Sequence, residues 1–452
     1  MTTHATSRTV GYIELIRRNR DFRRLFIGQV ISQTGDWFNS VALFTLLLSL
    51  GGSGSSIGFV LILKLLPSFV VGPLAGVVAD RFNRKTIMIV SDVARGIIVV
   101  GFLLVRRPDQ LWIAYALAAL QVIVSTFFDP AKSAALPSLV SREELIAANG
   151  LSSASWSVTL AIGAALGGVV TGAFGRDAAF AADSLSYFVS AAFISLTRFR
   201  WAEDPTKGEA RTPKAKLSFS DATGIADLIE GARYLRANRR VMALMLVKSG
   251  WGLGGGVLLL LTIFGKEIFP IGRDGSISIG LLYAARGAGA MVGPIIAQAI
   301  SGASSRAMRR TITVAFFISG VFYLLFAHAP VFGVAMLTVL GAHAGGSIQW
   351  VYSTTLLQLS VPNRFLGRVF AIELALLTLT MSLSTWLTGW GVDHAGVGAR
   401  SMATVLGVVF LAPGLAWWAI QRRLDRSDAT LLEGETESLT AEAPRETSFP
   451  PG

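Results

Sequence analysis

The 452-residue sequence contains no cysteine and only four histidines, and these absences exclude several kinds of chemistry. Without cysteine the chain has no disulfide, no thiol nucleophile and no cysteine-ligated zinc. The histidines are scattered along the chain and do not have the spacing of metal ligands. We also find no nucleophile–base pair and no phosphate-binding loop, so we expect neither an enzyme nor a bound cofactor.

Charge is scarce as well, because charged residues make up 15% of the chain and hydrophobic residues 52%. A soluble domain carries roughly 25% charged residues. The apolar residues form long runs, and a helix needs about 20 of them to cross a hydrocarbon core roughly 30 Å thick. Open strand edges are not tolerated in lipid. We therefore predict an all-α integral membrane protein. Its first 24 residues are polar and basic, unlike a cleavable signal peptide.

Twelve segments have the length and composition of transmembrane helices. They are residues 25–50, 57–79, 86–105, 111–128, 146–174, 178–196, 241–264, 277–300, 311–327, 331–356, 369–391 and 401–420. If both termini are cytoplasmic, 30 of the 40 Lys and Arg residues fall in cytoplasmic segments and six in outer loops. This asymmetry predicts a multi-pass protein of the bacterial plasma (inner) membrane with both termini inside. The net charge of +12 then reflects basic loops facing anionic lipid, not nucleic acid.

A polar stretch divides the twelve spans into two sets of six. We expect an amphipathic N-terminal segment (1–24), two six-helix bundles (25–199 and 241–421), a cytoplasmic linker (200–240) and a disordered cytoplasmic tail (422–452). Within the linker, apolar residues at helical spacing predict an amphipathic helix lying on the membrane: Ile225, Leu228, Ile229, Ala232 and Leu235.

The two halves resemble each other in sequence. "RRNRDF" at Arg17 is matched by "RANRRV" at Arg236, and "RKTIMI" at Arg84 by "RRTITV" at Arg309. Glycine and Gly-Pro pairs in the second helix of each half repeat in the same way, and all offsets lie between 219 and 225. A parallel repeat of six helices predicts two pseudo-symmetric bundles, the architecture of transporters that bind substrate between their halves.

The loop "GVVADRFNRK" resembles the signature loop of the major facilitator superfamily. The matching residues are Gly76, Asp80, Arg81, Arg84 and Lys85, and Asn83 stands where that loop has glycine, a change that keeps tolerance of positive φ. The resemblance implies a conformational latch at the cytoplasmic face. Asp92 and Arg95, three residues apart on the next span, are assigned to the same latch network.

Further segments resemble the branch that contains macrolide efflux proteins and the enterobactin exporter, among them "FRRLFIGQVISQTGDWF" and "AADSLSYFVSA". "GAALGG" is similar to that family's antiporter motif, with Ala164 in place of proline. Its glycines Gly163, Gly167 and Gly168 predict close helix packing, and packing of small residues alone is the alternative explanation. The fourth span lacks the arginine that many proton-coupled members carry there.

Ionisable residues inside spans are costly and are functional candidates by default. Asp36 is our first candidate for proton coupling and Glu373 the second. Lys64 and Arg286 lie 222 residues apart, so they are predicted symmetry mates. The candidates for lining a substrate cavity are Trp37, Lys64, Lys248, Trp251 and Arg286. Structural ion pairing within the bundles is the alternative for each charged group.

The function we expect is secondary active transport, with proton-coupled efflux of a hydrophobic or amphipathic small molecule such as a drug or siderophore. The resemblance implies alternating access and a proton gradient as the energy source. A lipid or lysolipid translocator is an alternative within transport, and a non-transporting receptor or scaffold is an alternative of another class. We expect a monomer whose partners are its substrate and membrane lipids.

Overall fold

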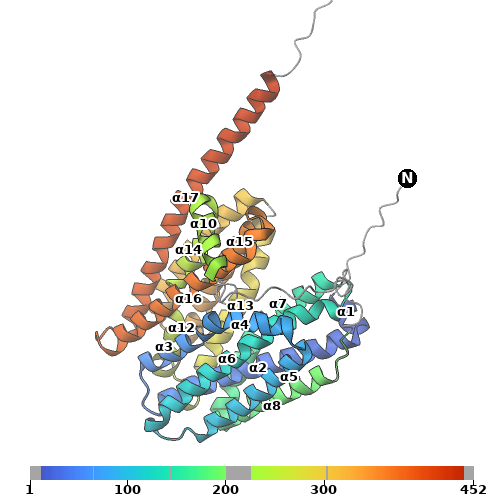
Figure 1. Ribbon diagram of the computed structural model, residues 1–452. Coiled ribbons are helices and arrows are strands. Elements are labelled where there is room, and N and C mark those ends of the chain that lie inside the picture. Colours follow the sequence, from blue (N-terminus) through green and yellow to red (C-terminus); the bar gives the residue numbers. More distant parts are fainter. Residues whose placement is uncertain (1–11, 65, 142–143, 200–224, 302–303, 442–452) are drawn as a thin grey trace, which may run out of the picture.

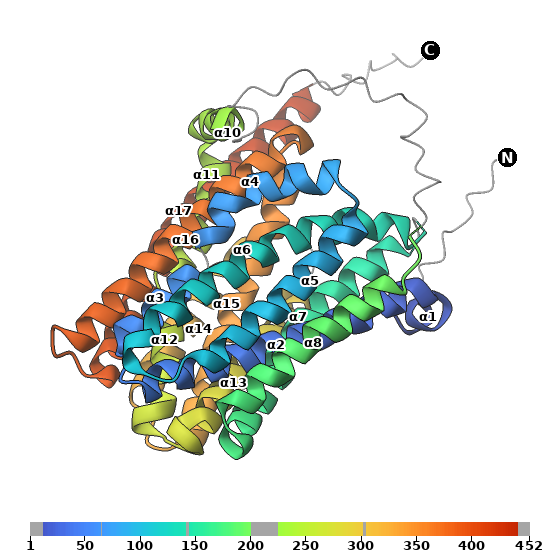
Figure 2. The same cartoon turned by 60° about the horizontal axis from the view of Figure 1, so that its bottom comes forward.

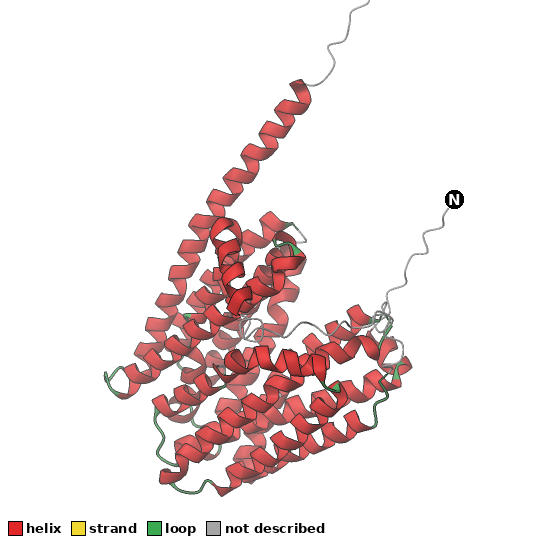
Figure 3. Ribbon diagram, in the orientation of Figure 1, coloured by secondary structure: helices red, strands yellow, loops and turns green. Residues whose placement is uncertain are grey.

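The computed structural model describes residues 12–441 except 65, 142–143, 200–224 and 302–303. The side chains of Gly76, Asp80 and Arg81 also lie outside the described part. Within it the chain is almost entirely helical and contains no strand (Figure 3). The prediction of an all-α protein is therefore confirmed.

The N-terminal half contains a short first helix and six membrane-length segments. Its helices are α1 (Tyr12–Arg18), α2 (Arg20–Ser49), α3 (Gly54–Leu63), α4 (Leu66–Arg81), α5 (Arg84–Gly101), α6 (Leu111–Ala135), α7 (Leu145–Phe174) and α8 (Arg176–Ser195). The second span is divided into α3 and α4. Asn83 caps α5: its side chain accepts a hydrogen bond from the backbone N–H of Thr86 at 3.2 Å. Its φ is −64°, so the asparagine serves as a helix cap and not as a substitute for glycine's positive φ.

The C-terminal half repeats this arrangement after a linker helix. Its helices are α10 (Ile225–Ala237), α11 (Arg239–Gly252), α12 (Val257–Ile263), α13 (Ser276–Ser301), α14 (Ser305–Ala327), α15 (Phe332–Ser360), α16 (Asn363–Asp393) and α17 (Ala399–Ala441). Figure 1 shows the two halves as separate bundles lying side by side. The predicted disordered tail from Arg422 is wrong for its first part, because α17 continues as a helix to Ala441.

The described chain has ten helical segments that are long and apolar enough to cross a membrane. The 30-residue helix α2 and the pair α3–α4 bring the number of predicted spans found as helices to twelve. The prediction of a twelve-helix membrane fold is confirmed. The segment from Arg239 to Ile268 is one such span, although its helix is interrupted near the middle.

That interruption covers Leu253–Gly256, between α11 and α12. Ser384 of α16 satisfies the freed backbone, since its hydroxyl donates to the Leu253 carbonyl at 2.6 Å and accepts from the Gly256 N–H at 3.1 Å. Gly255 and Gly256 leave no room for a side chain, because a Cβ would meet Met381 and Thr388. Broken helices are tolerated at membrane depth where neighbouring side chains re-satisfy the backbone.

The two halves meet through α7 against α13 and through α3 against α16 (Figure 2). A Cβ on Gly168 would lie 3.0 Å from the Cα of Gly280, so these two glycines bring the backbones of α7 and α13 together. We call the face that carries α1, the α4–α5 turn and α10 the basic face. The opposite face carries the α2–α3 turn, Gly175 and the turn after Asp393.

The linker helix α10 packs on α16 at the basic face. Tyr234 stacks on Phe365 with ring centroids 4.4 Å apart, and Glu230 pairs with Arg368 at 2.9 Å. A Cβ on Gly231 would contact Arg368 at 3.0 Å. The structure gives this helix, which was predicted to lie on the membrane, a protein partner as well; its place on the membrane stays a prediction. The side chains of Ile225, Leu228 and Ile229 lie outside the described part.

The bridge made by Ser384 gives a direct stability test. Ser384→Ala leaves a buried carbonyl and a buried N–H without their partner, and we expect a loss of about 1–3 kcal/mol in the free energy of unfolding. Thermal unfolding in detergent measures it. The matched control is Ser382→Ala on the same helix, because the buried Ser382 hydroxyl has no hydrogen-bond partner in the described part. Equal losses in both variants would contradict the assigned role.

Candidate transport site

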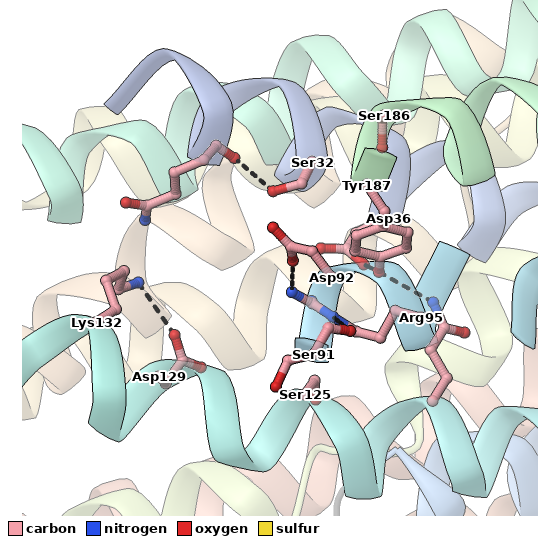
Figure 4. Close-up of polar contacts among 12 residues, drawn as sticks. Ser32, Asp36, Ser91, Asp92, Arg95, Ser125, Asp129, Lys132, Ser186 and Tyr187 are labelled. Carbon is pink, nitrogen blue, oxygen red and sulfur yellow. Dashed lines mark hydrogen bonds and ion pairs between the residues drawn. The ribbon is translucent and has the colours of Figure 1, made fainter. Parts of the chain in front are cut away.

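Asp36 lies inside the N-terminal half and is held by a tyrosine. The hydroxyl of Tyr187, on α8, donates to the Asp36 carboxylate of α2 and accepts from the Gln121 side chain of α6 at 3.1 Å. Tyr187 is fully buried. Three helices thus meet through one phenol group, which links Asp36 to the interior of the bundle (Figure 4).

Arg95 lies on the other side of the same tyrosine. Its guanidinium group is 4.4 Å from the centroid of the Tyr187 ring and 4.9 Å from that of Phe128. It also forms an ion pair with Asp92 one turn earlier on α5, and both side chains are buried. The stacking adds a cation–π interaction that is strengthened by the absence of water.

This position differs from the latch role predicted for Asp92 and Arg95. The two form a pair within one helix and belong to the interior cluster around Tyr187, away from the signature loop. Helix α5 carries its residues from the basic face into the bundle. The latch role stays a prediction, because the side chains of Asp80 and Arg81 lie outside the described part. Of the loop residues themselves, Lys85 donates to the carbonyls of Ser195 and Thr197 at the end of α8, at 2.7 and 2.9 Å. Arg84 donates to the Ala79 carbonyl at 3.4 Å.

A third carboxylate, Asp183, completes the interior of this half. Asn39 donates to one of its oxygens at 2.8 Å, and the other oxygen is buried with no hydrogen-bond partner among the described residues. Gly35 of α2 makes room for this unpartnered oxygen, since a Cβ at that position would lie 2.6 Å from it. Lys64 approaches from the end of α3 and donates to Ser40 at 2.8 Å.

Sequence reasoning missed Tyr187, Asn39 and Gln121 as members of this cluster. The available signal was the spacing of "DSLSY", in which Asp183 and Tyr187 lie one turn apart on one face of a helix. That face packs on α2, so polar residues at i and i+4 in an apolar run indicated a shared polar partner.

The charged residues of the C-terminal half form a separate pair. Lys248 of α11 lies 2.7 Å from Glu373 of α16, and both side chains are buried. The ammonium group also lies 4.6 Å from the Trp350 ring centroid and 5.6 Å from that of Phe370. This geometry favours the structural alternative for both residues over the predicted roles in substrate binding and proton coupling.

Arg286 contrasts with Lys248 because no described carboxylate lies within ion-pairing distance of it. Its guanidinium lies 5.9 Å from the ring centroid of Tyr283, one turn earlier on α13. That ring in turn contacts Phe44 at 5.9 Å and Trp37 at 6.2 Å, both on α2 of the other half. Lys64 lies 5.7 Å from the Phe44 centroid. The two predicted symmetry mates therefore flank one group of aromatic rings at the interface between the halves.

The remaining predicted residues have packing contacts. Trp251 makes an edge contact with Trp350, with centroids 6.2 Å apart, just before the break in the seventh span. Gly163 and Gly167 pack against Trp37 and Phe38 of α2, where a Cβ would come within 3.2 and 2.9 Å. Gly168 faces α13 across the interface. The motif thus joins α7 to one helix of its own half and one of the other.

On the opposite face, a carboxylate joins the two halves. Asp393, the last residue of α16, accepts hydrogen bonds from the backbone N–H groups of Gly54 and Ser55 at 3.1 and 2.6 Å. These are the first residues of α3, where unpaired N–H groups and the helix dipole attract negative charge. Lys266 also reaches across and donates to the Leu48 carbonyl at 3.2 Å. Polar contacts therefore connect the halves at this face in addition to the helix packing.

Two six-helix bundles with charged groups facing an aromatic interface define a multi-pass membrane transporter. The sequence model of the Major Facilitator Superfamily matches residues 25–385, so the chain belongs to that family. It is 29% identical to the uncharacterized MFS-type transporter YfiS of Bacillus subtilis over 89% of this chain and 93% of that protein. It is 25% identical to macrolide efflux protein A of Streptococcus pyogenes over 83% and 90%.

Solved structures agree on the fold. The nucleoside transporter NupG superposes with a TM-score of 0.65 at 12% identity, covering 88% of this chain and 98% of that one. The resemblance to the major facilitator superfamily, and the expectation of a transporter in place of an enzyme, are confirmed.

The Lys248–Glu373 pair can be tested by removing one partner and then both. Glu373→Leu leaves a buried ammonium group without its carboxylate, and we expect a loss of about 3–5 kcal/mol in the free energy of unfolding. Lys248→Met together with Glu373→Leu should recover at least half of that loss, because neither charge remains buried. Denaturation in detergent measures both. A double variant as unstable as the single one would contradict the pairing role.

Proposed function

We propose that this transporter exports an amphipathic small molecule in exchange for protons, and that Asp36 is the group that binds the proton. The observation that carries the proposal is the composition of the N-terminal interior. Its described residues include three buried or half-buried carboxylates, Asp36, Asp92 and Asp183, and two cations, Arg95 and Lys64.

An excess carboxylate in a membrane interior is costly unless it gains a counter-charge or a proton. Asp92 has Arg95 as its partner, and Asp183 accepts from Asn39. Asp36 is half-buried and touches a hydroxyl, which can donate to a carboxylate or accept from a protonated carboxyl group. The Tyr187 hydroxyl can therefore keep its hydrogen bond to Asp36 whether Asp36 is ionised or protonated, as a proton carrier requires.

Export by alternating access is supported by the contacts between the halves. The Asp393 contacts and the Gly168–Gly280 packing hold the halves together at the opposite face. We infer that the opposite face is the outer one, because the basic face carries most of the Lys and Arg residues. The conformation is then closed outside. The efflux relative supports the outward direction of transport.

Replacing Asp36 tests the coupling. Asp36→Asn removes the titrating group but keeps its shape, and we expect uptake driven by a pH gradient into inverted vesicles to fall at least tenfold. A panel of amphipathic dyes serves as substrate, and dye flux down its own gradient should persist. Asp129→Asn is the matched control, because Asp129 is exposed and pairs only with Lys132 among the described residues. Unchanged gradient-driven uptake in Asp36→Asn would sink the proposal.

Replacing Asp393 tests the outer closure. Asp393→Ala removes a charge from the α3 N-terminus, an interaction of about 0.3–2 kcal/mol, so the outward-open population should rise by a factor of roughly 2 to 30. Because the chain has no cysteine, spin labels on Asp109→Cys and Pro330→Cys report the separation of the two halves at this face.

The matched control for Asp393 is Asp177→Ala, since Asp177 lies on the same face but pairs with Arg106 within its own half. It should leave the distance distribution unchanged. If Asp393→Ala and Asp177→Ala give the same distribution as the parent protein, Asp393 does not hold the outer face closed.

A further inference from the structure

Arg286 carries a positive charge into the C-terminal half that no described residue balances. The structure gives its guanidinium no hydrogen bond and no ion pair with another described residue. Its contact is the Tyr283 ring, at 5.9 Å. The buried polar side chains of Tyr323 and His343, on α14 and α15 of the same half, hydrogen-bond each other at 3.1 Å. Arginine has five N–H donors and stays charged, so these donors require an acceptor from elsewhere.

The symmetry mate in the other half shows what is missing. Lys64 donates to Ser40, one turn after Asp36 on α2, in a half whose interior also carries Asp183. With the repeat offsets of 219–225, the positions that correspond to these aspartates are 255–261 and 402–408, and none of them holds an acidic residue. The C-terminal half therefore has a cation at the position equivalent to Lys64, but no acidic residue at the positions equivalent to Asp36 and Asp183.

The place is also reachable. Arg286 is half-buried and lies one turn from Tyr283 toward the basic face. Tyr283 contacts Trp37 and Phe44 of the other half, so Arg286 lies beside the aromatic group at the interface. Phe44 and Tyr283 are buried, whereas Trp37 is half-buried. A ligand there would therefore meet the Arg286 cation on one side and the Trp37 ring on the other. This combination suits an amphipathic anion.

We propose that Arg286 binds the anionic group of the transported molecule, which makes the substrate an amphipathic carboxylate or phosphate. This inference rests on the proposed function in taking the interface between the halves as the substrate site. A bidentate contact from the guanidinium would hold a carboxylate in one orientation, while the apolar part packs on the half-buried Trp37 ring. The anion would supply the charge balance that the protein itself lacks.

The test uses a matched pair of probes, pyrenebutyrate and its uncharged methyl ester. Binding to the full-length protein in detergent is followed by energy transfer from tryptophan to pyrene. We expect the carboxylate to bind at least tenfold more tightly than the ester, about 1.4 kcal/mol. Arg286→Gln should reduce this preference below twofold, and Arg286→Lys should retain part of it. Arg107→Gln, an exposed outer-loop change, is the control.

A second variant keeps the test decisive if Arg286→Gln is unstable. Ala290→Asp places a carboxylate one turn along α13, where it can pair with Arg286 and compete with the probe. It should also abolish the preference. A wild-type protein that does not prefer the carboxylate, or a preference that persists in both variants, overturns the proposal.

Competition separates the two sources of such an anion. Displacement of pyrenebutyrate by lysophosphatidic acid, lost in Arg286→Gln, supports a lipid headgroup, whereas displacement by octanoate alone supports a free carboxylate. Because binding is measured without a gradient, the outcome is independent of proton coupling. If the protein prefers the carboxylate but shows no gradient-driven transport, the proposed function is contradicted and the Arg286 site is supported. If it transports in response to the gradient but shows no such preference, the Arg286 site is contradicted and the proposed function is supported.

Discussion

The cost of burying charge in a membrane interior is the constraint on which this structure depends. Each ionisable group inside the bundles needs a counter-charge, a proton or a ligand. Lys248 and Glu373 meet this need within the protein, at 2.7 Å. Asp92 and Arg95 also pair, but the remaining charges do not balance within their own halves. The described N-terminal interior has one carboxylate too many, and the described C-terminal interior has one cation too many.

One cation from each half lies beside the interface between the halves. Lys64 and Arg286 flank the rings of Phe44 and Tyr283, which contact each other across the interface. A proton on one side and an anion on the other would each remove one unit of excess charge. If both proposals hold, occupancy of either site would change the electrostatic cost of closing the halves around the other, which is what coupling between two ligands requires.

The sequence was sufficient to predict the twelve spans, because runs of about 20 apolar residues have few alternatives to transmembrane helices. It was also sufficient for the repeat, since α3 and α13 begin 222 residues apart, as the offset of the motifs indicates. Partners were harder to predict. Nothing in the local sequence separates Glu373, which has a cation beside it, from Asp36, which has a phenol, because both partners come from distant helices.

Asp92 and Arg95 illustrate the same difficulty at closer range. Their spacing predicts that they pair, and they do, but the depth of the pair follows from the packing of α5 against α8, which the sequence does not state. The prediction of a disordered C-terminal tail was partly wrong for another reason. The polar residues after Arg422 lack an apolar run, yet helix α17 continues to Ala441, and a polar helix leaves no hydrophobic periodicity to detect.

The repeat also explains how one fold can acquire two different sites. Pseudo-symmetric halves begin with equivalent positions, so a cation near the middle of the second helix appears in both, as Lys64 and Arg286. Acidic residues on α2 and α8 accompany only the first of them. Loss or gain of two carboxylates therefore changes the charge around one member of the pair and not the other, while both halves keep the same backbone. On the proposals above, this difference would leave an aspartate for protons in one half and a cation for anions in the other.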